Sequence, residues 1–178
     1  RLVYSGYAGW TWDVEKANAS SSLSTDVRKS SQVAQYLIWG ALIGALLLWL
    51  ALAVFFRINP TLDWIFSDFG LFVAVCFLSP ILEEYVFRGL VYDYVERRSQ
   101  WHWPPNNVLN ISVSNLVSSM LFVIMHGLFR GFGAALLVIV PSLYLGILKR
   151  QTSGLGACII VHGIWNLGWF SLFAPEFN

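Results

Sequence analysis

The chain has 178 residues, of which 57% are hydrophobic and only 12% are charged. A water-soluble domain carries about 25% charged residues, so the composition excludes an ordinary soluble domain and indicates a membrane protein. The formal net charge of +1 provides no strong field for nucleic acid, and we expect no such partner.

The first part of the chain, residues 1–34, is polar and rich in serine. We expect it to form an extramembrane N-terminal arm. Residues 35–57 are predicted to form the first transmembrane helix. Their central part, 36–56, contains no charged side chain, and about 20 apolar residues suffice to cross a bilayer.

Four further apolar segments follow and together make up a predicted helical core at residues 68–174. They run from Phe69 to about Tyr92, from 108 to 129, from 132 to 148, and from Gly154 to Phe173. A loop rich in tryptophan and proline at 101–105 separates the first two. The expected fold class is therefore all-α, a polytopic transmembrane helix bundle of about five spans.

Basic residues are distributed unequally between the two sides of this predicted topology. Only Arg57 and Arg130 fall on the side opposite the N-terminus. The N-terminal side carries Arg28, Lys29, Arg97, Arg98, Lys149 and Arg150. Because cytoplasmic loops carry the excess of Lys and Arg, we expect the N-terminus on the cytoplasmic side.

Three charged residues, Glu83, Glu84 and Arg88, lie near the middle of the second predicted span. A charge at mid-bilayer costs at least about 2.5–3.5 kcal/mol, so three on one helix require an explanation. Glu84 and Arg88 are four residues apart and can pair on one helix face. Glu83 is turned about 100° away and is the freer carboxylate, which suits a general base. The pair itself is equally explained as a contact that only holds helices together.

Two other predicted spans contribute polar side chains. His126 lies on the third, and His162 and Asn166 lie four residues apart on the fifth. An imidazole and an amide on one face can donate two hydrogen bonds to one oxygen, as in an oxyanion hole. Polar groups on separate spans must face each other or a water-filled cavity. Together they supply the groups needed to activate water against a carbonyl.

These residues lie in three motifs that resemble those of the CPBP family, the CAAX proteases and bacteriocin-processing proteins, also called Abi proteins. Glu83 to Arg88 is similar to the family's Glu-Glu-x-x-x-Arg motif. Phe122 to His126 is similar to Phe-x-x-x-His, and His162 to Asn166 to His-x-x-x-Asn. The order and the placement on separate spans agree with the family over about residues 70–170.

The resemblance implies an intramembrane endopeptidase. It implies water activated by Glu83 and His126, an oxyanion site at His162 and Asn166, and a supporting ion pair of Glu84 and Arg88. Zinc bound by Glu83, His126 and His162 is the less favoured alternative, because His-Glu-x-x-His spacing is absent. We therefore expect neither a metal nor another cofactor. The expected partners are the lipid bilayer and a membrane-associated protein or peptide substrate.

Two other functions remain open. One is a non-catalytic protein on the same scaffold, such as a subunit or assembly factor of a larger membrane complex, or a bacteriocin immunity factor. The other is a transporter or proton relay, which the first and fourth predicted spans disfavour because they offer almost no polar residues for a path.

The depth of His126 is the main geometric question. Counted along its span, His126 lies about 10–15 Å from the level of Glu83 and His162. The stretch from Asn110 to Ser119 is polar, so we expect this helix to begin deeper in the membrane or to line a cavity. Either arrangement brings His126 to the depth of the site.

Overall fold

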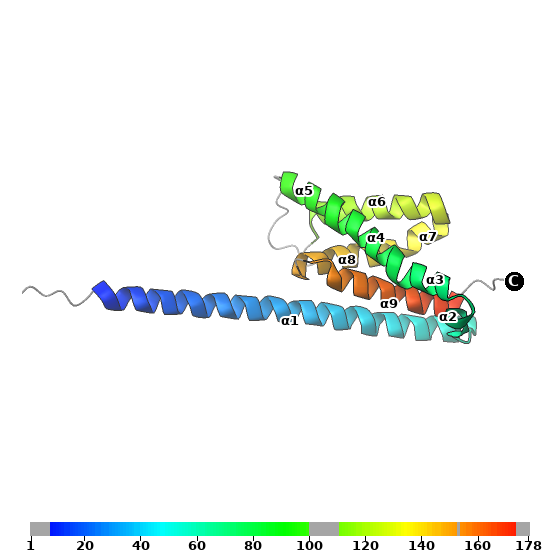
Figure 1. Ribbon diagram of the computed structural model, residues 1–178, viewed down its shortest axis with the longest axis horizontal. Helices are drawn as coiled ribbons and strands as arrows, with labels where there is room; N and C mark the ends of the chain where they lie inside the picture. Colours follow the sequence, from blue (N-terminus) through cyan, green and yellow to red (C-terminus); the bar gives the residue numbers. More distant parts are fainter. Residues whose placement is uncertain (1–7, 100–110, 153, 174–178) are drawn as a thin grey trace, which may run out of the picture.

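The computed structural model describes residues 8–99, 111–152 and 154–173, and these residues form helices without any strand. The helices pack into one bundle, from which a single long helix, α1, projects (Figure 1). The expected all-α helix bundle is therefore confirmed. The predicted loop at 101–105 and the first seven residues of the predicted arm lie outside the described residues.

Helix α1 spans Ala8–Phe56, 49 residues or about 73 Å at 1.5 Å per residue. This is more than twice the roughly 30 Å of a bilayer's hydrocarbon core. Its apolar part, suited to crossing a membrane, is Ser31–Phe56. The helix runs without a break through residue 34, the predicted end of the arm, and no proline precedes Pro60. The N-terminal half of α1 therefore extends beyond the other helices (Figure 1).

Short helix α2, Asp63–Ser67, returns the chain to the bundle. The N–H of Thr61 donates to the carbonyl of Ser171 at 3.0 Å. The buried indole of Trp64 donates from Nε1 to Ser171 Oγ at 3.4 Å. These contacts attach the start of the second span to the end of α9, Gly156–Phe173.

The second span, Phe69–Arg98, contains two π-helical turns. Pro80 explains the first, because proline has no N–H and its ring clashes with the carbonyl four residues earlier, that of Cys76. The backbone responds with a wider turn, in which the N–H of Ser79 donates to the carbonyl of Ala74. In order, the segments are α3 (Phe69–Val73), π-helix η1 (Ala74–Leu78), α4 (Ser79–Glu84), π-helix η2 (Tyr85–Val91) and α5 (Tyr92–Arg98).

Helix α6, Val113–Arg130, follows with a polar and buried first half. We expected this stretch to line a cavity or to begin the helix deeper in the membrane. Its buried side chains join α6 to its neighbours, and the depth of α6 in the membrane stays a prediction. Ser118 Oγ donates to the carbonyl of Phe87 at 2.6 Å, and Asn115 Nδ2 donates to that of Leu143 at 3.0 Å.

We expected one unbroken span at 132–148, and the structure has two shorter helices there. They are α7, Phe132–Leu137, and α8, Ile139–Thr152. The break follows from Pro141, whose ring would clash with the carbonyl of Leu137, the last residue of α7. The described part of the chain thus has four rather than five helices that are long and apolar enough to cross a membrane. They are Ser31–Phe56, Phe69–Arg98, Val113–Arg130 and Gly156–Phe173.

The remaining packing places the polar residues at the centre of the bundle. Helix α1 packs against α8 and α9, while the second span packs against α6 and α9. A small apolar core, from α1, α8 and α9, consists of Ala41, Leu145, Leu148, Cys158 and Val161. The charged residues of the second span lie where that span meets α6, α8 and α9.

Candidate active site

Glu84 and Arg88 form an ion pair with no exposed side-chain surface, and Arg88 Nη1 lies 3.2 Å from Glu84 Oε1. Arg88 Nη2 also donates to Ser142 of α8, at 2.9 Å to its carbonyl and 2.7 Å to its hydroxyl. The guanidinium lies over the ring of Phe122 on α6, with Cζ 4.7 Å from the ring centre. Arg88 therefore connects three helices around one buried charge.

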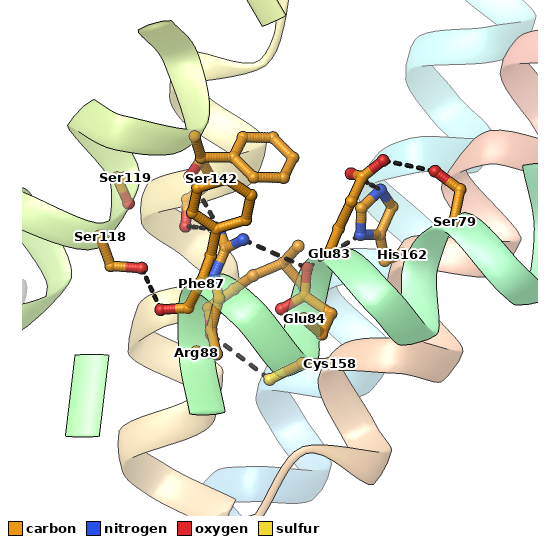
Figure 2. Close-up of polar contacts among 12 residues, drawn as sticks. Ser79, Glu83, Glu84, Phe87, Arg88, Ser118, Ser119, Ser142, Cys158 and His162 are labelled. Atoms are coloured by element: carbon orange, nitrogen blue, oxygen red, sulfur yellow. Dashed lines mark hydrogen bonds and ion pairs between the residues drawn. The ribbon is translucent and has the colours of Figure 1, made fainter. Parts of the chain in front are cut away.

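The imidazole of His162 lies between two carboxylates (Figure 2). Its Nδ1 is 2.8 Å from Glu84 Oε1, and its Nε2 is 3.7 Å from Glu83 Oε2. Glu84 is paired with Arg88 and therefore accepts hydrogen bonds as a carboxylate, so the proton of this contact belongs to His162 Nδ1. The contact sets the tautomer and the ring orientation, and it directs Nε2 toward Glu83.

Glu83 is the less constrained of the two carboxylates. Its Oε1 accepts a hydrogen bond from Ser79 Oγ, one helical turn earlier (Figure 2). Its Oε2 is buried and has no hydrogen-bond partner among the described residues. The side chain as a whole is 25% exposed, against 0% for Glu84. Glu83 is thus the more exposed of the two carboxylates, and one of its oxygens makes no hydrogen bond among the described residues.

His126 lies beside the site but not in direct contact with its charges. Its Nδ1 is 3.1 Å from the carbonyl of Phe122, and the two rings stack with centres 4.3 Å apart. The buried Phe122 ring also lies 6.0 Å from the ring of His162. Within the described residues, no hydrogen bond or ion pair joins His126 to Glu83 or His162. Because a carbonyl only accepts, His126 Nδ1 is the donor and its Nε2 carries a lone pair.

Asn166 and His162 are on the same helix, four residues apart, yet their side chains have different partners. Asn166 Nδ2 donates to the carbonyl of Val75 in η1 at 2.8 Å. The described residues include no hydrogen bond between Asn166 and His162. The structure therefore joins Glu83, Glu84, Arg88 and His162 directly, while His126 and Asn166 are attached through Phe122 and through the η1 backbone.

Two polar residues of the site were missing from our prediction, Ser79 and Ser142. The spacing of Ser79, four residues before Glu83 on one helix, could have identified it. Nothing in the sequence indicated Ser142, which follows Pro141 inside an apolar segment. Its contact with Arg88 depends on how α8 packs against the second span.

The zinc alternative requires Glu83, His126 and His162 to converge on one point. Among the described residues, no group of three or more His, Cys, Asp or Glu side chains is arranged to hold a metal ion. In this arrangement His126 donates from Nδ1 to its own helix, and His162 from Nδ1 to Glu84. Both hydrogen bonds leave Nε2 as the ring atom that a metal would take, so it is the spacing of the side chains, and not these hydrogen bonds, that disfavours a ligand set.

A family model described as type II CAAX prenyl endopeptidase Rce1-like matches residues 63–168, more than half of the chain. The matched range contains all six residues predicted for the site. No curated protein and no solved structure matches the chain.

Proposed function

Because this chain belongs to the Rce1-like family of type II CAAX prenyl endopeptidases, we propose that it is an intramembrane endopeptidase. It hydrolyses a peptide bond of a membrane-associated protein or peptide with a water molecule activated by glutamate and histidine. The observation that carries this proposal is the arrangement of His162 between Glu84 and Glu83, at 2.8 Å and 3.7 Å. A structural ion pair of Glu84 and Arg88 does not require a second carboxylate beside the same imidazole.

Glu83 is the proposed general base. Ser79 holds its Oε1, and Oε2 remains without a partner among the described residues, 3.7 Å from His162 Nε2. We place the attacking water against Oε2, where Glu83 can act on it as a base. Glu83 accepts its proton as the oxygen attacks the peptide carbonyl. The same proton then passes to the departing amine, which leaves Glu83 ionised for the next turnover.

The other site residues act on the water and on the negative charge that forms. His126 presents the Nε2 lone pair and assists in orienting the water, since contacts of this kind tighten when substrate binds. His162 and Asn166 donate to the oxygen of the tetrahedral intermediate. Because His162 Nδ1 already donates to Glu84, donation to the oxyanion comes from its Nε2. Glu84 and Arg88 support His162 and do not react.

We propose that hydrolysis is metal-free. This is supported by the side chains of the described residues, among which no three or more His, Cys, Asp or Glu are grouped to hold a metal ion. A chelator such as 1,10-phenanthroline is expected to leave the cleavage rate unchanged. Loss of activity that returns when zinc is added would favour the zinc alternative with Glu83, His126 and His162 as ligands.

We also propose that the N-terminus lies on the cytoplasmic side. Lys149 at the end of α8 lies 3.4 Å from Asp93 on α5, so the basic ends of both helices lie at one end of the bundle. The wild-type cysteines are buried, which makes labelling clean. In intact cells an impermeant maleimide should label Arg130→Cys, and it should label Arg98→Cys only after permeabilisation. The reverse pattern would contradict this orientation.

The decisive experiment compares new protein termini in cells that express wild type or Glu83→Gln. The proposal predicts termini that appear with wild type and not with Glu83→Gln. Asp63→Asn is the matched control, because it also removes one carboxylate, but from an exposed residue of α2 that lies away from the site. Identical termini in the wild-type and Glu83→Gln cells would instead favour the non-catalytic alternative, a subunit or assembly factor of a larger membrane complex.

A further inference from the structure

The π-turn of η1 leaves one backbone carbonyl without a helical donor. In this turn an N–H donates to the carbonyl five residues earlier, as Ser79 does to Ala74. The next donor in the series would be residue 80, for the carbonyl of Val75. Residue 80 is proline, which has no N–H. The proline that causes the wide turn therefore also removes the backbone partner of Val75.

Asn166 supplies the missing donor from another helix, with its Nδ2 at 2.8 Å from the carbonyl of Val75. Unpaired backbone groups are costly inside a membrane, because no water is there to satisfy them. The carbonyl of Val75 lies in a buried part of the second span. Its hydrogen bond with Asn166 is therefore required by the presence of Pro80 and is not an incidental contact.

The approach of the two helices at this point depends on Gly163. A Cβ on Gly163 would lie 2.5 Å from the carbonyl oxygen of Cys76. Cys76 is four residues before Pro80, so its carbonyl also loses its ordinary α-helical donor to the proline. Both carbonyls affected by Pro80 thus face α9. The carbonyl of Cys76 lies beside Gly163, and the carbonyl of Val75 accepts from Asn166.

We propose that Pro80 is a positioning residue for Asn166. By removing the N–H that would otherwise pair with Val75, it leaves an acceptor that anchors the Asn166 carboxamide. The amide has two N–H groups, so anchoring one fixes the direction of the other. That second N–H is the oxyanion donor, a last step that rests on the proposed endopeptidase function. Pre-organised donors of this kind require no reorientation during the reaction.

A double-mutant cycle on the full-length protein tests the anchoring without any substrate. Pro80→Ala restores an N–H, so Val75 gains a backbone donor and no longer depends on Asn166. We expect Asn166→Ala to raise the unfolding equilibrium constant about fivefold less in the Pro80→Ala background than in wild type. Equal losses in the two backgrounds would overturn the proposal.

Asn115 provides the matched control for this cycle. Its carboxamide also donates to a backbone carbonyl of another helix, that of Leu143 at 3.0 Å, but no proline removes a donor there. Asn115→Ala and Pro80→Ala are therefore expected to be additive. Coupling of the same size at Asn115 would show that Pro80 acts on the bundle in general, and this would overturn the specific assignment.

A spectroscopic measurement covers the case in which Asn166→Ala does not fold. In protein labelled with ¹⁵N-asparagine, one side-chain amide proton of Asn166 should be protected from exchange with solvent. Pro80→Ala is expected to reduce that protection several-fold, while Pro60→Ala, at an exposed position outside the helices, should leave it unchanged. Unchanged protection in Pro80→Ala would contradict the proposal.

The two proposals fail in different ways. If the cycle shows coupling and the protein cleaves no substrate, the anchoring stands and the endopeptidase function fails. If an active enzyme shows no coupling, the function stands and the role of Pro80 fails. Where both hold, Pro80→Ala should lower kcat and leave KM unchanged, because a misplaced oxyanion donor affects the transition state and not substrate binding.

Discussion

At the scale of single residues, one carboxylate oxygen, Oε1 of Glu84, contacts two other side chains of the site. Oε1 of Glu84 accepts from Arg88 Nη1 at 3.2 Å and from His162 Nδ1 at 2.8 Å. The position of the imidazole is therefore coupled to that of the guanidinium through a shared acceptor. A substitution of Arg88 is therefore expected to change the position of His162, although no hydrogen bond joins these two side chains.

Replacing Arg88 tests this coupling. Arg88→Met leaves Glu84 buried without its cation, which is expected to destabilise the fold by about 3–5 kcal/mol. Adding Glu84→Gln removes the uncompensated charge and should recover part of the loss. Reversible unfolding in detergent measures both changes.

Arg98→Met is the control for that experiment. Arg98 is an exposed arginine on the same span that lies over the ring of Tyr94. Its replacement should change stability by no more than about 0.5 kcal/mol. Similar costs at positions 88 and 98 would contradict the role assigned to the buried pair.

Ser79 offers a second test at this scale. Its hydroxyl donates to Glu83 Oε1, which leaves Oε2 as the oxygen that we propose reacts with water. Ser79→Ala frees the carboxylate to rotate and should lower kcat about tenfold, equivalent to one hydrogen bond to a charged group. Ser79→Thr retains the hydroxyl and should retain the rate. Equal rates for wild type and Ser79→Ala, measured on a peptide identified as a substrate in cells, would show that this hydrogen bond is unimportant.

At the scale of helices, the site depends on how closely α9 approaches the second span. Gly163 sits beside the carbonyl of Cys76, and an added Cβ would come within 2.5 Å of that oxygen. Because backbone atoms cannot move aside as a flexible side chain can, Gly163→Ala must separate the two helices. The preceding residue, His162, would then move away from Glu83 and Glu84.

We expect Gly163→Ala to destabilise the protein by about 1–3 kcal/mol and to reduce cleavage. Gly44→Ala is the matched control, since Gly44 lies within α1 and a Cβ there meets nothing within 4 Å. It should leave stability unchanged or raise it by up to about 1 kcal/mol. Thermal unfolding of the two variants measures both changes. A smaller loss of stability for Gly163→Ala than for Gly44→Ala would refute the close approach of α9 to the second span.

Sequence patterns predicted the helices well and their mutual contacts less well. Apolar runs identified the four helices suited to crossing the membrane, because the bilayer imposes both their length and their composition. Our prediction of one span at 132–148 missed the break between α7 and α8, although the sequence contains Pro141 there. The hydrophobicity of residues 132–148 does not reveal this break, because it takes no account of the steric clash between the Pro141 ring and the carbonyl of Leu137.

In the candidate site, too, contacts within one helix were predicted correctly and contacts between helices were not. Spacing on one helix correctly placed Glu84 beside Arg88, a contact at 3.2 Å. Spacing does not determine which residue of a neighbouring helix a side chain meets. The structure places His162, and not His126, next to Glu83. That choice depends on how α9 packs against η1 and α4, which helical periodicity does not encode.

At the scale of the whole molecule, the polar residues converge from four helices into a bundle whose outer surface is apolar. The large hydrophobic side chains exposed on the second span, α6 and α1 include Phe77, Leu82, Met120 and Leu47. In a membrane this surface faces lipid, and the charges are confined to the interior. Such confinement strengthens every electrostatic interaction inside the site.

We propose that Glu83 activates water for peptide hydrolysis in the interior of the helix bundle. The most direct test of this proposal is the cleavage rate of purified protein in lipid vesicles, for wild type and Glu83→Gln, on a peptide first identified by its new terminus in cells. Loss of a general base should lower kcat by about 100-fold or more, while Glu83→Gln remains folded and binds the same peptide. Cleavage by Glu83→Gln at the wild-type rate would contradict the account.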